Sequence, residues 1–318
     1  MTKHLYFVWW VTAAMLALGS LWPEPNIDLA RSVLSELVKL LPLIVSVALM
    51  AGWLASSTLA DRLRGALNHR PWLAILFASL IGAVTPVCGI ASVPLVAALL
   101  RQGVPMASAM AFWLSSPITD PGMLILTAGI LGWPFAIGKL LAALLLGLVA
   151  GVVTQGLIYW KPQSHWVRQD ALQQSVPSSF DSSAQSRFVA ETRATFALVI
   201  RWLAFALILE AWVRSHLGDT GYSILTTVDS VWAVPLAVAI GGPLYIEGYA
   251  ALPLLRGLID MGLTPGAAMA FLISGAAISL YSAIAVWSLV RPAIFGLYLT
   301  LSIVGALVAG WVTDIVMT

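Results

Sequence analysis

The stretch TPVCGIASVP, residues 85–94, places two prolines, a glycine and the only cysteine of the chain inside a long apolar segment. Proline removes a backbone donor and glycine tolerates non-helical conformations, so this stretch predicts a break in a helix. The apolar pieces on either side, within residues 72–100, are each shorter than the ~20 residues that cross a bilayer. The segment therefore either crosses as a broken helix or turns back as a re-entrant hairpin, and a short helix is expected to begin near Ile90.

The composition indicates an all-α, polytopic integral membrane protein. The chain has 318 residues, of which 60% are hydrophobic and 9% charged, whereas soluble domains average about 45–50% apolar and about 25% charged residues. A formal net charge of +2 leaves no basic excess that would indicate nucleic-acid binding. A single cysteine excludes an internal disulfide.

The apolar segments predict several membrane spans. Continuous candidates lie at residues 5–21, 37–60, 106–131, 134–160, 194–212, 264–290 and 292–315. Residues 72–100 and 231–259 each consist of two short pieces joined by a proline and glycine break. Residues 5–21 also fit a signal peptide, but the sequence that follows is a poor cleavage site.

The distribution of lysine and arginine predicts the orientation. If both broken segments are hairpins, the basic loops fall on the cytoplasmic side, as the positive-inside rule requires. If both segments cross instead, the 160–193 loop moves outside. The hairpin arrangement is therefore preferred, with a cytoplasmic N-terminus in a bacterial cytoplasmic (inner) membrane.

The sequence matches itself at a constant offset of 159 residues. At this offset AMAF at 109–112 meets AMAF at 268–271, and LVAGVVT at 148–154 meets LVAGWVT at 307–313. An ungapped match over about 100 residues indicates two homologous halves. The expected organisation is an extra N-terminal helix and loop (1–36), repeat 1 (37–160), a polar cytoplasmic linker (161–193) and repeat 2 (194–318).

With hairpins, each repeat crosses the membrane three times, and an odd number inverts the second repeat. Inverted repeats whose broken elements meet near the midplane are typical of secondary transporters, with the substrate site at the repeat interface. The alternative is that both breaks are packing kinks with no ligand.

The two breaks carry different chemistry. At the offset of 159, Cys88 in the first break is opposite Glu247 in the second, and Tyr245 lies two residues before Glu247. A carboxylate in a membrane span costs ~2.5–3.5 kcal/mol on insertion scales, so by default it marks a transport path or proton relay. The alternative for Glu247 is a position near the hairpin mouth, neutralised by an arginine such as Arg256. Cys88 is either a small apolar filler or a soft ligand.

Backbone groups at the first break are further candidates. The turn leaves carbonyls and amides of Thr85, Pro86 and Gly89 without helical partners. A helix beginning near Ile90 would direct its positive N-terminus at the turn, where an anionic group could rest.

A second break is predicted one helix later, in SSPITDP at residues 115–121. Its two prolines remove backbone donors, and we expect the hydroxyls of Ser115, Ser116 and Thr119 to satisfy the freed groups. Asp120 has no basic residue within two turns. It is either a carboxylate for proton or cation coupling or the cap of the helix that follows. The partner stretch is SGAAIS at 274–279, in which Ser274 is a further candidate.

The sequence also gives an expected position for two further large side chains. Trp113 lies close to the break and is expected to line a cavity. Lys139 is expected to extend its ammonium toward the membrane surface, as lysines in apolar helices commonly do.

Motifs of other protein classes do not occur in the chain. It contains no GxxxxGK[ST] loop, no HExxH and no paired CxxC, and its four histidines lie outside the predicted spans. Nucleotide-driven transport by this chain alone, membrane metalloprotease activity and haem binding are therefore not expected. No enzymatic activity, metal or cofactor is predicted.

The stretches at residues 85–121 and 241–275 resemble the predicted permeases related to the bacterial organoarsenical efflux permease, a group with a duplicated hairpin. The likeness covers most of the chain from about residue 40. In that family the first break usually reads P-x-C-S-C. Here Cys88 matches the first cysteine, whereas Ile90 stands at the second. A thiol pair suits trivalent arsenic, so the resemblance implies a permease far more strongly than it implies an arsenical cargo.

The expected function is secondary active transport, and more specifically export, of a small solute that is organoarsenical-like or another small anion or metabolite. Asp120 and Glu247 would take up and release protons or cations while the two hairpin tips hold the substrate. A gradient-independent channel and a non-transporting membrane enzyme or assembly factor are the alternatives. The expected partners are the lipid bilayer, the substrate and the coupling ion, and the oligomeric state, including a homodimer, stays open.

Overall fold

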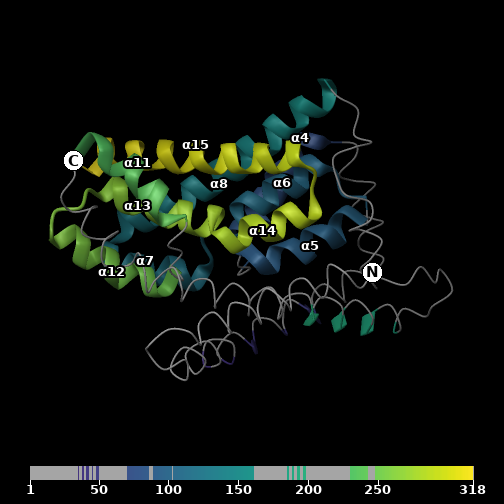
Figure 1. The fold of residues 1–318 in the computed structure, drawn as a ribbon, viewed down its shortest axis with the longest axis horizontal. Helices are drawn as coiled ribbons and strands as arrows, with labels where there is room; N and C mark the ends of the chain where they lie inside the picture. The colour runs from purple at the N-terminus through teal and green to yellow at the C-terminus, as the bar shows by residue number, and fades with distance from the viewer. Residues whose placement is uncertain are drawn as a thin grey trace, which may run out of the picture.

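A computed structural model of the chain describes residues 70–85, 89–101, 103–160, 230–242 and 248–317, with isolated positions between 35 and 49 and between 185 and 197. The expected spans at 5–21, 37–60 and 194–212 and the linker at 161–193 lie outside these residues for all or most of their length. The described elements are helices, as the all-α prediction requires (Figure 1). Their bounds are α4 (Pro71–Val84), α5 (Gly89–Arg101), α6 (Met106–Ser115), α7 (Pro121–Leu131), α8 (Trp133–Trp160), α11 (Ser230–Gly241), α12 (Gly248–Asp260), α13 (Pro265–Ile278), α14 (Leu280–Leu289) and α15 (Pro292–Met317).

The two segments with proline and glycine breaks each form two short helices. In the first, α4 ends at Val84 and α5 begins at Gly89, so the predicted helix start near Ile90 is confirmed. In the second, α11 ends at Gly241 and α12 begins at Gly248. Neither segment contains one helix long enough to cross a bilayer, which the spacing of Pro and Gly correctly indicated.

The helix over residues 106–131 is also interrupted, as predicted. Residues 116–120 separate α6 from α7. The prediction of a single span over residues 264–290 is wrong in detail. Ser279, with ψ 140°, separates α13 from α14, because its extended backbone cannot continue the helix.

The two long helices are continuous. Helix α8 has 28 residues and α15 has 26, and both are apolar enough to cross a membrane. At 1.5 Å per residue each exceeds the ~30 Å hydrocarbon core. They agree with the predicted spans at 134–160 and 292–315. In Figure 1, α15 runs back from the side where α8 ends to the side where the C-terminus lies, so the two helices have opposite chain directions.

Glycines bring the short helices close to the long ones, and the same contacts recur 159 residues later. A Cβ on Gly151 would contact Ile75 and Ala111, and a Cβ on Gly310 would contact Val234 and Ala270. Each contact residue in the second half is the offset equivalent of one in the first. Small residues at helix crossings allow the close backbone approach on which membrane helices rely.

A second glycine pair shows the same correspondence. A Cβ on Gly82 would lie 2.8 Å from the carbonyl oxygen of Phe112, and one on Gly241 would lie 2.9 Å from that of Phe271. In both halves the added atom would also collide with a serine hydroxyl, that of Ser115 or Ser274. The two halves therefore use one packing scheme, in which α4 and α8 flank α6 and α11 and α15 flank α13.

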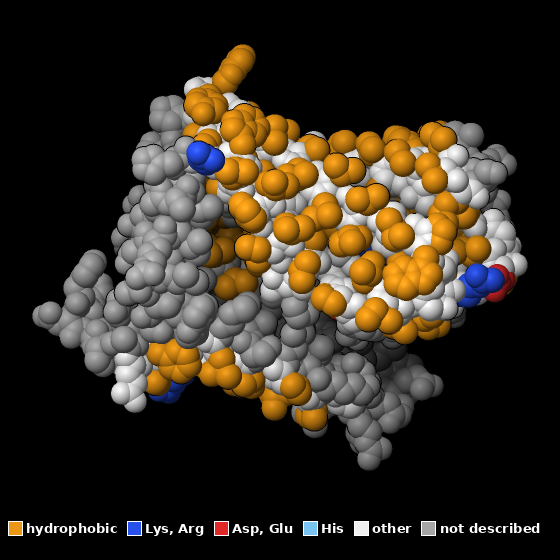
Figure 2. Space-filling model, turned by 180° about the vertical axis from the view of Figure 1, so that it is seen from behind, with side chains coloured by type: hydrophobic (Ala, Val, Ile, Leu, Met, Phe, Trp, Pro, Cys, Tyr) orange, Lys and Arg blue, Asp and Glu red, His pale blue; other side chains and the backbone are white. Residues whose placement is uncertain are grey.

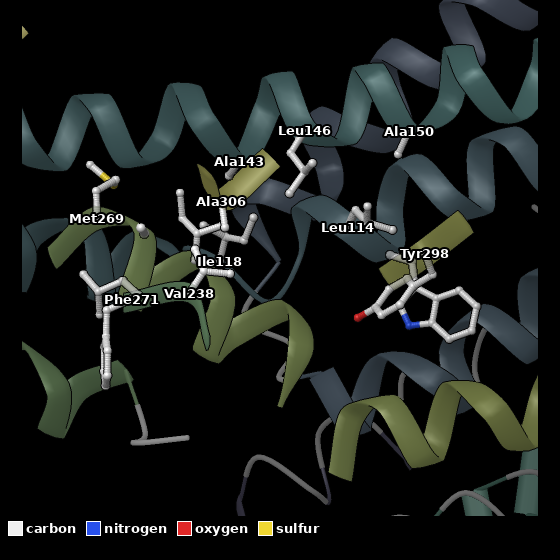
Figure 3. Close-up of a cluster of buried hydrophobic side chains, with 14 of the residues drawn as sticks. Leu114, Ile118, Ala143, Leu146, Ala150, Val238, Met269, Phe271, Tyr298 and Ala306 are labelled. Carbon is white, nitrogen blue, oxygen red and sulfur yellow. The ribbon is translucent and has the colours of Figure 1, made fainter. Parts of the chain in front are cut away.

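The halves are interleaved through their shorter helices. Helix α5 of the first half packs against α14 of the second, and α12 of the second packs against α7 of the first. Between these contacts α8 crosses α15, where a Cβ on Gly305 would collide with Leu146. Leu146 and Gly305 are themselves offset equivalents. Buried side chains from both halves form the core around this crossing (Figure 3).

The outer surface of the described long helices is largely apolar. Figure 2 shows hydrophobic side chains spread over the described face, with the few charged side chains toward its left and right ends. Large exposed apolar residues occur along both long helices, among them Leu141, Leu145, Val304 and Val308. A contiguous apolar surface of this extent is characteristic of a face in contact with lipid.

Candidate functional site

Asp120 lies at the break between α6 and α7 and caps the second helix. Its extended backbone (φ −142°, ψ 169°) ends the break, and its Oδ1 accepts the Met123 N–H at 2.9 Å. The capping role that the sequence left open for Asp120 is therefore present in the structure. Capping uses part of the hydrogen-bonding capacity of the carboxylate and does not remove its charge.

Lys139 is the residue that sequence reasoning misjudged. Its side chain is 1% exposed, and it is the one charged residue among the described ones that is buried. The prediction that its ammonium reaches the membrane surface is wrong, because α8 directs the side chain into the protein. Nζ has no hydrogen-bond partner among the described residues. Burial removes water from the ammonium, and the Asp120 carboxylate is the charged group that opposes this effect.

The hydroxyls of the break do not behave as predicted. Ser115 donates to the carbonyls of Ala111 (2.9 Å) and Phe112 (3.2 Å), which belong to its own helix. Ser116 and Thr119 are buried, and their hydroxyls have no partner within the described part of the chain. These hydroxyls therefore remain available to a ligand or to water, whereas the sequence expected them to satisfy freed backbone groups.

The equivalent positions of the second half are neutral and internally bonded. At the offset of 159, Asp120 corresponds to Ser279 and Lys139 to Tyr298. Ser279 donates to the Ser282 hydroxyl at 2.7 Å, and the Tyr298 hydroxyl donates to the Ala277 carbonyl at 2.6 Å. Each site thus contains a residue of a helix break and a buried side chain from the adjacent long helix. The side chains are ionisable in the first site and neutral in the second.

Trp113 belongs to the neutral site. It is 1% exposed and its ring centroid lies 5.7 Å from that of Tyr298. Its indole Nε1 has no hydrogen-bond partner among the described residues. The expectation that Trp113 lines a cavity is replaced by a packed position against Tyr298.

The two sites lie on opposite sides of the α8–α15 crossing. A Cβ on Gly138, next to Lys139, would meet the methyl of Met269 at 3.6 Å. Figure 3 shows Met269 and Tyr298 near opposite ends of the row formed by Ala143, Leu146 and Ala150 on α8. The neighbours of Lys139 and of Tyr298 are therefore different.

The first break ends beside the neutral site. A Cβ on Gly89, the first residue of α5, would collide with the Ser282 hydroxyl and lie 3.5 Å from the Ala276 carbonyl oxygen. On the other side of the break, the Thr85 hydroxyl donates to the Ile81 carbonyl at 2.5 Å, so Thr85 closes the last turn of α4. Gly89, the residue that follows the break, thus contacts α14 of the other half.

The remaining sequence candidates divide into two groups. Ser274 is buried and donates to the Phe271 carbonyl at 3.2 Å. Pro86, Cys88, Tyr245 and Glu247 lie outside the described residues. Arg256, the proposed neutraliser of Glu247, pairs with Asp260 at 3.1 Å on the exposed face of α12. No group of three or more His, Cys, Asp or Glu side chains that could hold a metal occurs in the described part of the chain.

Apolar helices with buried polar side chains at their breaks are those of a membrane protein, and comparison with known proteins gives the family. Residues 29–315 match ArsP_1, described as "Predicted permease". The chain belongs to this permease family, which the resemblance of its break sequences correctly indicated.

Curated relatives are consistent with this family. UPF0718 protein YraQ of Escherichia coli is 30% identical over 252 residues, which are 76% of this chain and 65% of the relative. UPF0718 protein YcgR of Bacillus subtilis is 28% identical over 122 residues, or 38% and 42%. A Streptococcus mutans protein, provisionally named a two-component membrane permease complex subunit, is 28% identical over 133 residues, or 41% and 44%. The chain thus spans less than two thirds of the length of these relatives. No solved structure gives a significant match.

Proposed function

We propose that this protein is a secondary active permease of a bacterial cytoplasmic membrane that exports a small solute, coupled to protons or cations. The observation that carries the proposal is the interleaving of the broken helices: α5 packs against α14, and α12 packs against α7. Non-helical backbone within a membrane is tolerated only where protein or a watery cavity surrounds it. The breaks of the two halves therefore belong together, as at the substrate site of a transporter.

An inverted relation between the halves supports alternating access in this proposal. The matched glycine contacts give both halves the same packing, and α8 and α15 have opposite chain directions (Figure 1). Transporters with inverted repeats expose a site near the midplane to each side in turn by moving one repeat against the other. In this scheme the segments with breaks at 85–88 and 242–247 are re-entrant hairpins, and the N-terminus is cytoplasmic.

The coupling role is assigned to Asp120 and Glu247. An intramembrane carboxylate is by default part of an ion pathway. Asp120 lies at a helix break and acts on Lys139. Helix α12, which begins at the residue after Glu247, packs against α7, which begins at the residue after Asp120. In this proposal the chain transports without an enzymatic activity of its own.

The test is flux through the purified full-length protein in proteoliposomes. Methylarsenite, methylarsonate, inorganic phosphate and acetate serve as candidate cargoes, with an imposed proton or sodium gradient. Saturable flux that follows the gradient and loses this response in Glu247→Gln supports the proposal. Equal flux in Glu247→Gln removes that residue from the mechanism. Non-saturable flux without countertransport would indicate a channel, and absence of flux for every solute would favour a non-transporting role.

A matched variant separates the two roles of Asp120. Asp120→Ser installs the residue of the second half and keeps a side chain that caps helices well. Loss of gradient response with retained folding assigns coupling to the carboxylate. Unchanged coupling in Asp120→Ser would leave Asp120 with capping alone.

A further inference from the structure

We propose that the ligand of the break between α6 and α7 is a small anion, a carboxylate or an oxyanion, held by Lys139 with the hydroxyls of Ser116 and Thr119. The inference rests on the proposed permease function, because it names the substrate class of that same site. It is independent of the hairpin tips, whose residues the structure does not describe.

The first argument is that the site contains buried donors without a hydrogen-bond partner in the described part of the chain. An ammonium has three N–H donors and no acceptor, and Lys139 Nζ has no hydrogen-bond partner among the described residues. The hydroxyls of Ser116 and Thr119 are likewise buried without a partner there. Burying such groups without acceptors is strongly unfavourable. A ligand rich in acceptors supplies what these side chains lack.

The second argument is electrostatic. Lys139 is desolvated by its burial, and the charged group that opposes this effect is Asp120, whose Oδ1 accepts the Met123 N–H. An anion brings an opposite charge and acceptors to the ammonium, and protonation of Asp120, the coupling carboxylate of the proposed function, removes the repulsion between that carboxylate and the anion. An anion would form charge-assisted hydrogen bonds, which are shorter and stronger than neutral ones.

The third argument comes from the second half of the chain. The fold can satisfy a polar side chain at this position, because Tyr298, the equivalent of Lys139, donates to the Ala277 carbonyl at 2.6 Å. The corresponding carbonyl in the first half belongs to Ile118, yet Lys139 Nζ forms no such bond. The unpaired ammonium of Lys139 is therefore not a general consequence of the architecture at this position.

The experiment measures equilibrium binding to the purified full-length protein in lipid nanodiscs. The probes are acetate, inorganic phosphate, sulfate and methylarsonate as sodium salts, against sodium chloride at equal ionic strength, with acetamide as a neutral analogue. At least one oxyanion is expected to bind more tightly than chloride and acetamide. Lys139→Met is expected to weaken that binding by about 10- to 100-fold, the range for loss of a charge-assisted hydrogen bond.

Two further variants control for folding and for charge. Lys139→Arg keeps the charge and is expected to retain binding within about tenfold. Tyr298→Phe changes the equivalent position and is expected to leave anion affinity unchanged. If Lys139→Met does not yield folded protein, Thr119→Val gives the test instead, because it removes one orphaned hydroxyl and preserves side-chain volume.

Two results would overturn the inference: no oxyanion binds more tightly than chloride, or binding is the same in Lys139→Met and Thr119→Val as in the unmodified chain. Failure of the permease proposal gives a different result. Anion binding that depends on Lys139 without gradient-driven flux would refute transport alone. Gradient-driven flux of a solute without such binding would refute the anion assignment alone.

Discussion

The helix breaks after α6 and after α13 occupy equivalent positions in two halves with the same packing, and their chemistry differs. In the first half, Asp120 and Lys139 place an acidic and a basic side chain at the break. In the second, Ser279 and Tyr298 are neutral and form hydrogen bonds within the protein. At one break the two equivalent side chains are thus satisfied by hydrogen bonds within the protein, and at the other Lys139 Nζ has no hydrogen-bond partner among the described residues. The unsatisfied site is where we expect ligand and coupling chemistry.

The largest expected effect comes from removing the carboxylate of the charged site. Asp120→Ala leaves Lys139 buried without its counter-charge and is expected to destabilise the protein by about 3–5 kcal/mol, with loss of the cap included in the effect. The double variant Asp120→Ser with Lys139→Tyr reproduces the neutral pair of the second half. The double variant should recover most of the lost stability. Thermal unfolding monitored by size-exclusion chromatography compares Asp120→Ala, the double variant and the unmodified protein.

If the double variant is no more stable than Asp120→Ala, charge burial is not the reason for the loss. The loss of stability in Asp120→Ala would then come from removal of the helix cap alone. Asp120→Ser alone keeps the cap and removes the charge, so its unfolding temperature separates these two contributions.

The packing shared by the halves predicts equal losses at equivalent glycines. In Gly82→Ala and Gly241→Ala the new methyl meets a backbone carbonyl at 2.8 and 2.9 Å and a serine hydroxyl. Overpacking of this kind costs about 1–3 kcal/mol, and both variants should lose stability by similar amounts. Gly129→Ala is the control, because a Cβ there has no neighbour within 4 Å. A large loss at one glycine and none at the other would show that the halves are packed differently.

A smaller effect is expected at the neutral site. Tyr298→Phe leaves the buried Ala277 carbonyl without its donor and should cost about 1–2 kcal/mol. Anion binding at Lys139 should be unaffected, because the two side chains lie on opposite sides of the α8–α15 crossing. A change in anion affinity in Tyr298→Phe would mean that the sites form one cavity. Thermal unfolding and the nanodisc binding assay measure the two quantities on the same sample.

The smallest effect is expected at the surface of α12. Arg256 and Asp260 form an i, i+4 pair at 3.1 Å with side chains 54% and 57% exposed. Such pairs contribute about 0.2–0.5 kcal/mol, so Arg256→Ala should scarcely change the unfolding temperature. If Arg256→Ala instead abolished gradient-driven flux in proteoliposomes, the arginine would have a role beyond its pair with Asp260.

The positions of the helix breaks were predictable because they depend on local backbone chemistry. Pro86, Pro117 and Pro121 lack the N–H that would continue a preceding helix, and Gly89 tolerates non-helical backbone. The break at Ser279 was not predicted as a division of the span at 264–290. No proline or glycine occurs there, so the tertiary environment determines it.

The charged site was predictable only in part. Asp120 was recognised because a carboxylate in an apolar segment is costly wherever it points. Lys139 was misjudged, because a long lysine in an apolar helix can reach either the membrane surface or the interior. The direction depends on which face of α8 meets its neighbours, and this is decided by packing contacts such as that of Gly147 with Ser79 and Ala111.

By itself the sequence determined the membrane class, the permease family, the offset of 159 residues and most helix breaks. All of these follow from composition, self-similarity and the backbone preferences of proline and glycine. Only the tertiary structure decided which polar groups meet. Asp120 acts electrostatically on Lys139, whose Nζ has no acceptor among the described residues. At the equivalent position, the Tyr298 hydroxyl donates to the Ala277 carbonyl. The physical reason is that side-chain partners depend on how helices distant in sequence cross, and local preferences do not specify those crossings.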